Sequence, residues 1–158
     1  MPTSTIFAKL NLKEQAEIVI LNAPASFEAE IGKLQGVIVR RKLPSRGPIT
    51  FALSFVTQQA EVDSSAKSLA RLTEGDAVIW FAYPKGTSKR YKCDFNRDTG
   101  WAALGVLGFE GVRLVAIDED WSAMRFRRTE FIKAFARDAS RAMSAKGQRR
   151  VAKRKHAG

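Results

Sequence analysis

Residues 49–83, ITFALSFVTQQAEVDSSAKSLARLTEGDAVIWFAY, decide the fold of this chain. They contain two apolar runs, Ile49 to Val56 and Asp76 to Tyr83. The first run is apolar on both faces, which is typical of a strand in the middle of a parallel sheet. Between the runs, Gln58 to Leu72 carries apolar residues near helical spacing, and Gly75 follows. The stretch therefore predicts two strands joined by a crossover helix.

The preceding residues predict a second unit of the same kind. Ala16 to Leu21 (AEIVIL) is a short run rich in β-branched residues, which favours a buried strand. Ser26 is placed to cap a short helix that continues to about Leu34, with Gly36 beyond its end. Val37 to Val39 then begins the next strand.

The residues that follow predict a hairpin and a last helix. Thr99 to Leu107 indicates a short helix, and Val112 to Ile117 (VRLVAI) indicates a strand. After the polar residues 118–120, Ser122 to Arg128 alternates in polarity, which favours a hairpin partner at the edge of the sheet. Glu130 to Met143 has apolar residues at helical spacing, so we expect it to pack on the body.

Alternating strands and helices predict an α/β fold class: a three-layer, Rossmann-like, mostly parallel sheet with a C-terminal antiparallel hairpin, followed by a helix and a basic tail. The length of 158 residues suits one core, so we expect a single domain over 1–143 and a disordered tail over 144–158. Cys93 is the only cysteine, and neither a signal peptide nor a long apolar segment is present. These features predict a cytoplasmic protein.

The net charge of +11 is concentrated near the C-terminus. Residues 125–158 carry 12 Lys and Arg against two acids, whereas residues 1–124 carry 15 against 14. This asymmetry predicts salt-sensitive contact with nucleic acid or another polyanion, although a solubilising tail without a defined partner fits it equally well. The candidate polyanion-binding residues are Arg40, Arg41, Lys146, Arg149, Arg150, Lys153, Arg154 and Lys155.

A small ligand is expected beyond the carboxyl ends of the strands, where α/β sheets bind their ligands. Residues 85–89 (KGTSK) leave a strand end with two cations and two hydroxyls. This chemistry suits a phosphate or carboxylate, and a solvated surface turn is the alternative. The candidate ligand-binding residues are Asn22, Thr57, Lys85, Ser88, Lys89 and Asp118.

Catalytic and metal sites are not indicated by the sequence. The acids at residues 118–120 suit magnesium or a general base, but consecutive residues of an extended segment point in alternating directions. A polar turn anchored by Trp121 is therefore favoured. The only histidine, His156, lies in the tail, so Cys93 has no histidine partner in the body. We predict no catalytic residue, no metal and no cofactor.

Three stretches together are similar to a bacterial family, domain-of-unknown-function family 3052: VILNAP at 19–24, VIWFAYPKGTSK at 78–89, and GWAALGVLGFEGVRLVAIDEDWSAMRFRR at 100–128. The resemblance covers about residues 13–128. It implies a shortened class I methyltransferase fold and assigns no activity.

Two positions differ from the methyltransferase pattern that the resemblance implies. That class has a glycine-rich loop after its first strand, where the backbone approaches the cofactor, and an acidic residue after its second strand. Here the loop at residues 22–27 has no glycine, and Arg40 and Arg41 stand where the acid is expected.

The leading functional hypothesis is a non-enzymatic binding protein, a degenerate methyltransferase-like domain whose basic tail contacts nucleic acid or another polyanion. The alternative is an enzyme that binds S-adenosylmethionine or a small anionic ligand at the carboxyl ends of the strands. A partner-docking scaffold is a third hypothesis, and an exposed apolar patch is its discriminating sign.

Overall fold

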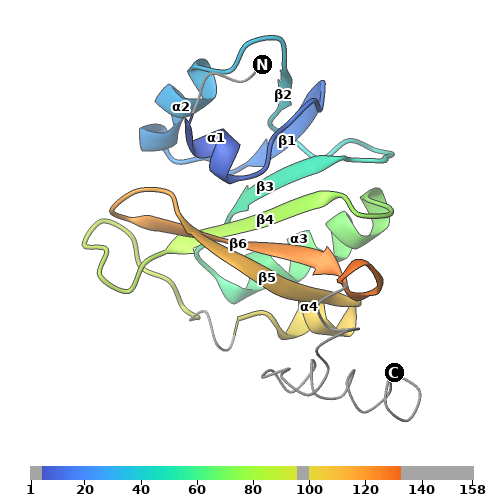
Figure 1. Cartoon of the computed structure of the whole chain (residues 1–158). Helices are drawn as coiled ribbons and strands as arrows, with labels where there is room; N and C mark the ends of the chain where they lie inside the picture. The colour runs from blue at the N-terminus through green and yellow to red at the C-terminus, as the bar shows by residue number, and fades with distance from the viewer. Residues whose placement is uncertain (1–4, 96–99, 133–158) are drawn as a thin grey trace.

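The computed structural model describes residues 5–95 and 100–132 and contains a six-stranded sheet (Figure 1). The strands are β1 (Glu17–Leu21), β2 (Ile38–Arg40), β3 (Phe51–Phe55), β4 (Val78–Pro84), β5 (Phe109–Ala116) and β6 (Trp121–Arg128). Their order in the sheet is β2-β1-β3-β4-β6-β5. The first four are parallel, and β6 is antiparallel to both β4 and β5. The predicted α/β sheet with a C-terminal hairpin is confirmed.

The order of the two hairpin strands in the sheet differs from the prediction. Residues 122–128 were expected at the edge of the sheet, but β6 lies between β4 and β5, and β5 forms the edge. The physical reason is burial: Ala123 and Phe126 of β6 are 0% and 2% exposed on opposite faces of the sheet. In β5, by contrast, residues 111–114 are all exposed. The strand with two buried faces takes the inner position.

Helices cover both faces of the sheet, which gives the predicted three layers (Figure 1). The short helices α1 (Thr5–Lys9) and α2 (Glu28–Gly32) pack on one face, and this packing forms the α1–α2 core. The long helix α3 (Gln59–Leu72) and the short helix α4 (Ala102–Val106) pack on the other, in the α3–α4 core. The central strands are therefore buried on both sides.

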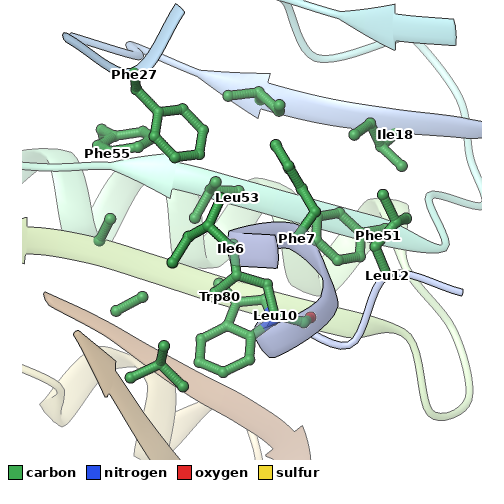
Figure 2. Packing of buried hydrophobic residues seen from close by; sticks show 14 of the residues in the cluster. Ile6, Phe7, Leu10, Leu12, Ile18, Phe27, Phe51, Leu53, Phe55 and Trp80 are labelled. Carbon is green, nitrogen blue, oxygen red and sulfur yellow. The ribbon is translucent and has the colours of Figure 1, made fainter. Parts of the chain in front are cut away.

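Helix α1 was not predicted from the sequence, yet it fills the middle of the α1–α2 core (Figure 2). Phe7 and Leu10 are both completely buried. The indole Nε1 of Trp80, in the central strand β4, donates a hydrogen bond to the carbonyl oxygen of Leu10 at 2.7 Å. A five-residue helix is too short to show apolar periodicity, so only its packing reveals it.

Several predicted boundaries change locally. Ser26 does not cap a helix, because the chain enters a 3-10 helix at Ala25–Phe27 after Pro24 and then continues into α2. The helix expected over 99–107 is reduced to α4. Of the helix expected over 130–143, only the 3-10 turn Thr129–Phe131 and Ile132 are described.

The remaining residues of that helix and the predicted tail at 144–158 lie outside the described residues. In the part of the chain that the structure describes, no helix combines the length and the apolar character needed to cross a membrane.

Candidate ligand-binding site at the carboxyl end of the sheet

The strand order places a topological switch between β1 and β3. These strands are parallel neighbours, with Leu21 paired to Ser54. After β1 the chain turns into the α1–α2 core, where Phe27 and Ile31 are buried, whereas after β3 it turns into the α3–α4 core through Val62. In open α/β sheets, ligands bind beyond the carboxyl ends of the strands at such a switch point.

Asn22 forms the turn at the end of β1. Its φ of 59° lies in the left-handed region, which asparagine tolerates better than other residues with a Cβ. Its side-chain Nδ2 lies 3.5 Å from the carbonyl oxygen of Phe55 at the end of β3. Asn22 therefore turns the chain in a left-handed conformation, as glycine does in glycine-rich loops, and it lies at the carboxyl end of β1. Its role in ligand binding stays a prediction.

Thr57 lies at the end of β3, but its polar groups are already engaged. The Thr57 amide and hydroxyl both donate to Oε1 of Glu61, at 2.8 and 3.2 Å, and the Gln58 amide donates to the same oxygen at 3.1 Å. The Gln59 amide donates to Oδ1 of Asp94 at 2.7 Å. Two carboxylates thus occupy the amino-terminal end of α3, and we call Glu61 and Asp94 the acidic corner.

The acidic corner was missed by the sequence analysis. Glu61 carries a signal that could have been used, because a Glu three residues after the N-cap, here Gln58, completes a capping box. Asp94 lies in an irregular segment without any such pattern. It is brought to α3 by its own backbone, whose amide donates to the Thr57 carbonyl at 3.0 Å. Negative charge at this point suits a cationic group of a ligand.

The segment after β4 forms a separate hollow beside the acidic corner. Lys85, Ser88 and Lys92 line a pocket of about 490 Å³ at the end of β4. The Ser88 hydroxyl donates to Oδ1 of the buried Asp120 at 2.9 Å and accepts from the Tyr91 amide at 3.1 Å. Ser88 therefore shapes the loop. Lys89 is exposed and does not line the pocket, whereas Lys92 does and was not among the candidates.

Asp118 has a structural role in the turn between β5 and β6. Its Oδ1 accepts hydrogen bonds from the backbone amides of Asp120 and Trp121, at 2.8 and 2.9 Å. Trp121 is 3% exposed and packs against Phe55 and Tyr91, as an anchor for the turn. Within residues 5–95 and 100–132, no group of three or more potential ligand side chains is placed to hold a metal ion.

Cys93 lines the pocket but is a poor nucleophile. Burial raises the pKa of the Cys93 thiol, and the negative charges of Asp94 and Glu61 raise it further, against a hydrogen bond from the Phe95 backbone that lowers it. A thiol with a raised pKa stays protonated at neutral pH, and the thiolate is the reactive form. The side chain is therefore a neutral part of the pocket wall.

Arg40 and Arg41, two of the candidate polyanion-binding residues, form ion pairs with carboxylates of the described part of the chain. Arg40 forms an ion pair with Glu17. Arg41 donates to both carboxylate oxygens of Glu28, at 2.7 and 2.9 Å. Their positive charges are thus locally balanced. The other candidates for polyanion contact, at residues 146–155, lie outside the described residues.

A larger hollow of about 780 Å³ lies at the other end of the sheet. Its lining includes Lys13, Glu14 and Ala16, which precede β1, and Thr50, which precedes β3. Ligands of open α/β sheets bind at the carboxyl ends of strands, and this hollow is at the amino ends. We therefore place the candidate site at the acidic corner and the pocket after β4.

Comparison with known proteins identifies the fold of this chain but no family. No protein-family model matches, so membership of domain-of-unknown-function family 3052 is not confirmed, and no curated protein matches either. Among solved structures, a SAM-dependent methyltransferase from Aquifex aeolicus is similar with a TM-score of 0.58 and 10% identity, over 78% of this chain and 88% of that chain. The N-methyltransferase NodS from Bradyrhizobium japonicum gives a TM-score of 0.52 and 13% identity, over 78% and 93%.

A possible exported protein from Bordetella parapertussis is similar at a TM-score of 0.53 and 10% identity, over 78% of this chain and 65% of that one. At these identities the likeness concerns the fold alone. The chain therefore has a Rossmann-like fold of the class I methyltransferase type.

S-adenosylmethionine is the cofactor that this fold implies. The residues of the site suit its positively charged groups but not its ribose. The ammonium and sulfonium groups of the cofactor are cations, and Glu61 and Asp94 offer carboxylates at the start of α3, after β3. The ribose hydroxyls need an acceptor at the end of β2. Arg40 and Arg41 offer donors only. We derive no methyl-transfer step from such a donor set.

Proposed function

We propose that this chain is a small-ligand-binding protein of the methyltransferase type, and that its ligand at the β1–β3 switch is S-adenosylmethionine or a similar cationic adenosyl compound. The proposal is carried by one observation, the left-handed turn of Asn22 at the switch point of a methyltransferase-like sheet. The similarity of the fold to SAM-dependent methyltransferases supports it.

The charge at the switch supports a cationic ligand over an anionic one. A helix amino terminus ordinarily attracts anions through its free backbone amides. At α3 the amides of Gln58 and Gln59 donate to the carboxylates of Glu61 and Asp94, so negative side-chain charge lies at this helix end. Ligands with a sulfonium and an ammonium group are attracted to such a corner, whereas a phosphate is repelled.

The end of β2 offers no free carboxylate to the ribose hydroxyls of the ligand, because Arg40 and Arg41 stand there. Arg41, which follows β2, donates both of its hydrogen bonds to Glu28, so neither side chain is free for a ribose hydroxyl. We therefore expect the charged end of the ligand to contribute more to affinity than the ribose does.

The test compares S-adenosylmethionine with S-adenosylhomocysteine, which lacks the sulfonium charge, by isothermal titration calorimetry. We expect the charged compound to bind about tenfold more tightly, which corresponds to about 1.4 kcal/mol. Glu61→Gln and Asp94→Asn keep a carbonyl oxygen as hydrogen-bond acceptor for the amides of α3 and remove the charge. The double variant should lose most of the tenfold preference.

Glu74→Gln is the matched control, because Glu74 is an exposed acid beyond the other end of α3. Its titration should match that of the unchanged protein. Equal affinity for the two compounds, or binding of neither, contradicts the proposal.

A further inference from the structure

The pocket after β4 has its own chemistry, which differs from that of the acidic corner. Its walls come from the end of β4, from the segment that follows it, and from β5 and β6 of the hairpin. The apolar part consists of Phe95, Leu114 and the rings of Tyr83 and Tyr91. At about 490 Å³ the pocket is within the size range of small-molecule sites, which is roughly 300–1,000 Å³.

Two lysines give this pocket its charge. Lys85 and Lys92 both line it, and no acidic side chain does so among the described residues. In the described parts of the chain, no ion pair holds either lysine. The nearby carboxylate of Asp120 accepts from the Ser88 hydroxyl, and the Ser122 hydroxyl adds a polar group to the lining.

The pocket and the acidic corner are joined by a short segment. Cys93 lines the pocket, and the next residue, Asp94, belongs to the acidic corner. The Asp94 amide is tied to the end of β3 through the Thr57 carbonyl at 3.0 Å. A basic and an acidic subsite thus lie side by side at the carboxyl end of the sheet, so a cationic and an anionic ligand could be bound together.

From this arrangement we propose that the pocket after β4 binds a small organic anion, a carboxylate or phosphate attached to an aromatic or branched apolar body. Lys85 and Lys92 bind the anionic group, and the apolar body lies against Phe95 and Leu114. The inference deepens the proposed function, on which it rests for the role of the anion as a second ligand beside the adenosyl compound. Binding of the anion itself needs no adenosyl compound.

The test is calorimetric titration of the full chain with phenyl phosphate and, separately, benzoate, at an ionic strength of about 0.15 M, where the Debye length is about 8 Å. Benzyl alcohol, which has the ring without the charge, and inorganic phosphate, which has the charge without the ring, are the comparison ligands. We expect saturable binding of at least one aromatic anion, at least tenfold tighter than either comparison ligand. The two arms distinguish a phosphate from a carboxylate.

Lys85→Met and Lys92→Met together remove both charges and keep side chains of similar length, and the pair should weaken binding of the aromatic anion at least tenfold. Lys67→Met, at an exposed position on α3, is the matched control and should leave it unchanged. Ser122→Phe, which fills the pocket and keeps the lysines, should also weaken binding.

Three outcomes overturn the inference: no binding of either aromatic anion, equal binding of benzyl alcohol, or an equal effect of Lys67→Met. A separate titration of S-adenosylmethionine into the same protein separates this failure from failure of the proposed function. Binding of the adenosyl compound without an aromatic anion overturns only the inference. The reverse result overturns the proposed function and leaves the pocket as an anion site.

Discussion

At the scale of single residues, the two asparagines with positive φ allow a controlled test of the switch point. Asn22 follows β1 at the carboxyl end of the sheet, and Asn11, with φ of 65°, precedes β1 at the amino end. Alanine in the left-handed region costs about 1–2 kcal/mol. Asn22→Ala and Asn11→Ala should therefore both lower the free energy of unfolding by about 1 kcal/mol in urea titrations.

Only Asn22→Ala should weaken binding of S-adenosylmethionine, and Asn22→Gly should preserve it. Equal loss of binding in both alanine variants would assign the effect to stability alone.

At the scale of elements, α3 is held at its carboxyl end by the last strand. The guanidinium of Arg128 in β6 donates to the carbonyl oxygens of Gly75, Ala70 and Thr73, at 3.0, 3.2 and 2.9 Å, and lies 4.9 Å from the ring of Phe109. Cations bound at a helix carboxyl end stabilise it. Arg128→Ala should lower the free energy of unfolding by about 2–3 kcal/mol, because three hydrogen bonds from a charged donor to carbonyl oxygens are lost together.

Arg128→Lys should recover only part of that stability, since a single ammonium cannot reach the carbonyls in the fork geometry of arginine. Arg113→Ala, at an exposed position of the neighbouring strand β5, is the control and should change the free energy by less than about 0.5 kcal/mol. Urea denaturation gives all three values. A loss below about 0.5 kcal/mol for Arg128→Ala would refute the capping role.

At the scale of the whole molecule, the basic residues outside the described part of the chain are the predicted site of polyanion binding. Residues 133–158 carry nine Lys and Arg against one acid. Any affinity for a polyanion should therefore depend on them. Fluorescence anisotropy with labelled duplex DNA should show affinity that falls with salt, with a log-log slope of about 0.9 per phosphate contacted. Replacing the six basic residues of the tail by glutamine should remove most of it: Lys146, Arg149, Arg150, Lys153, Arg154 and Lys155.

The matched control is the double variant Arg40→Gln and Arg41→Gln. Because these arginines are paired with Glu17 and Glu28, their loss should reduce the affinity for DNA far less than loss of the tail charges. If the two sets of substitutions have equal effects, the separation between tail and body is wrong. The contact with nucleic acid remains a prediction until then.

The third hypothesis, a docking scaffold, has one feature of the expected kind. Val106 of α4 is 88% exposed, and Val112 and Leu114 of the edge strand β5 are 38% and 42% exposed. Leu114 also lines the pocket after β4, and nothing among the described residues indicates what would bind at Val106 and Val112. These exposed side chains carry less weight than the pocket, whose charge and shape define a class of ligand.

The sequence by itself determined the strands, the long helix and therefore the class of fold. Residues 49–83 carry this information because apolar runs and helical spacing are local patterns, and local patterns set local structure. It also determined that Lys85 and Ser88 follow a strand, and that Asn22 and Thr57 follow two others. The parallel pairing of those strands then brings the three loops to one end of the sheet.

Only the tertiary structure decided which partners the charged side chains at that end of the sheet contact. Asp94 and Glu61 meet at the start of α3 across more than thirty positions of sequence, and Ser88 meets Asp120 over a similar separation. The insertion of β6 beside β4 depends likewise on residues far apart in the chain. Such contacts form because buried polar groups require partners and apolar strands require two covered faces, and neither requirement is visible in a local pattern.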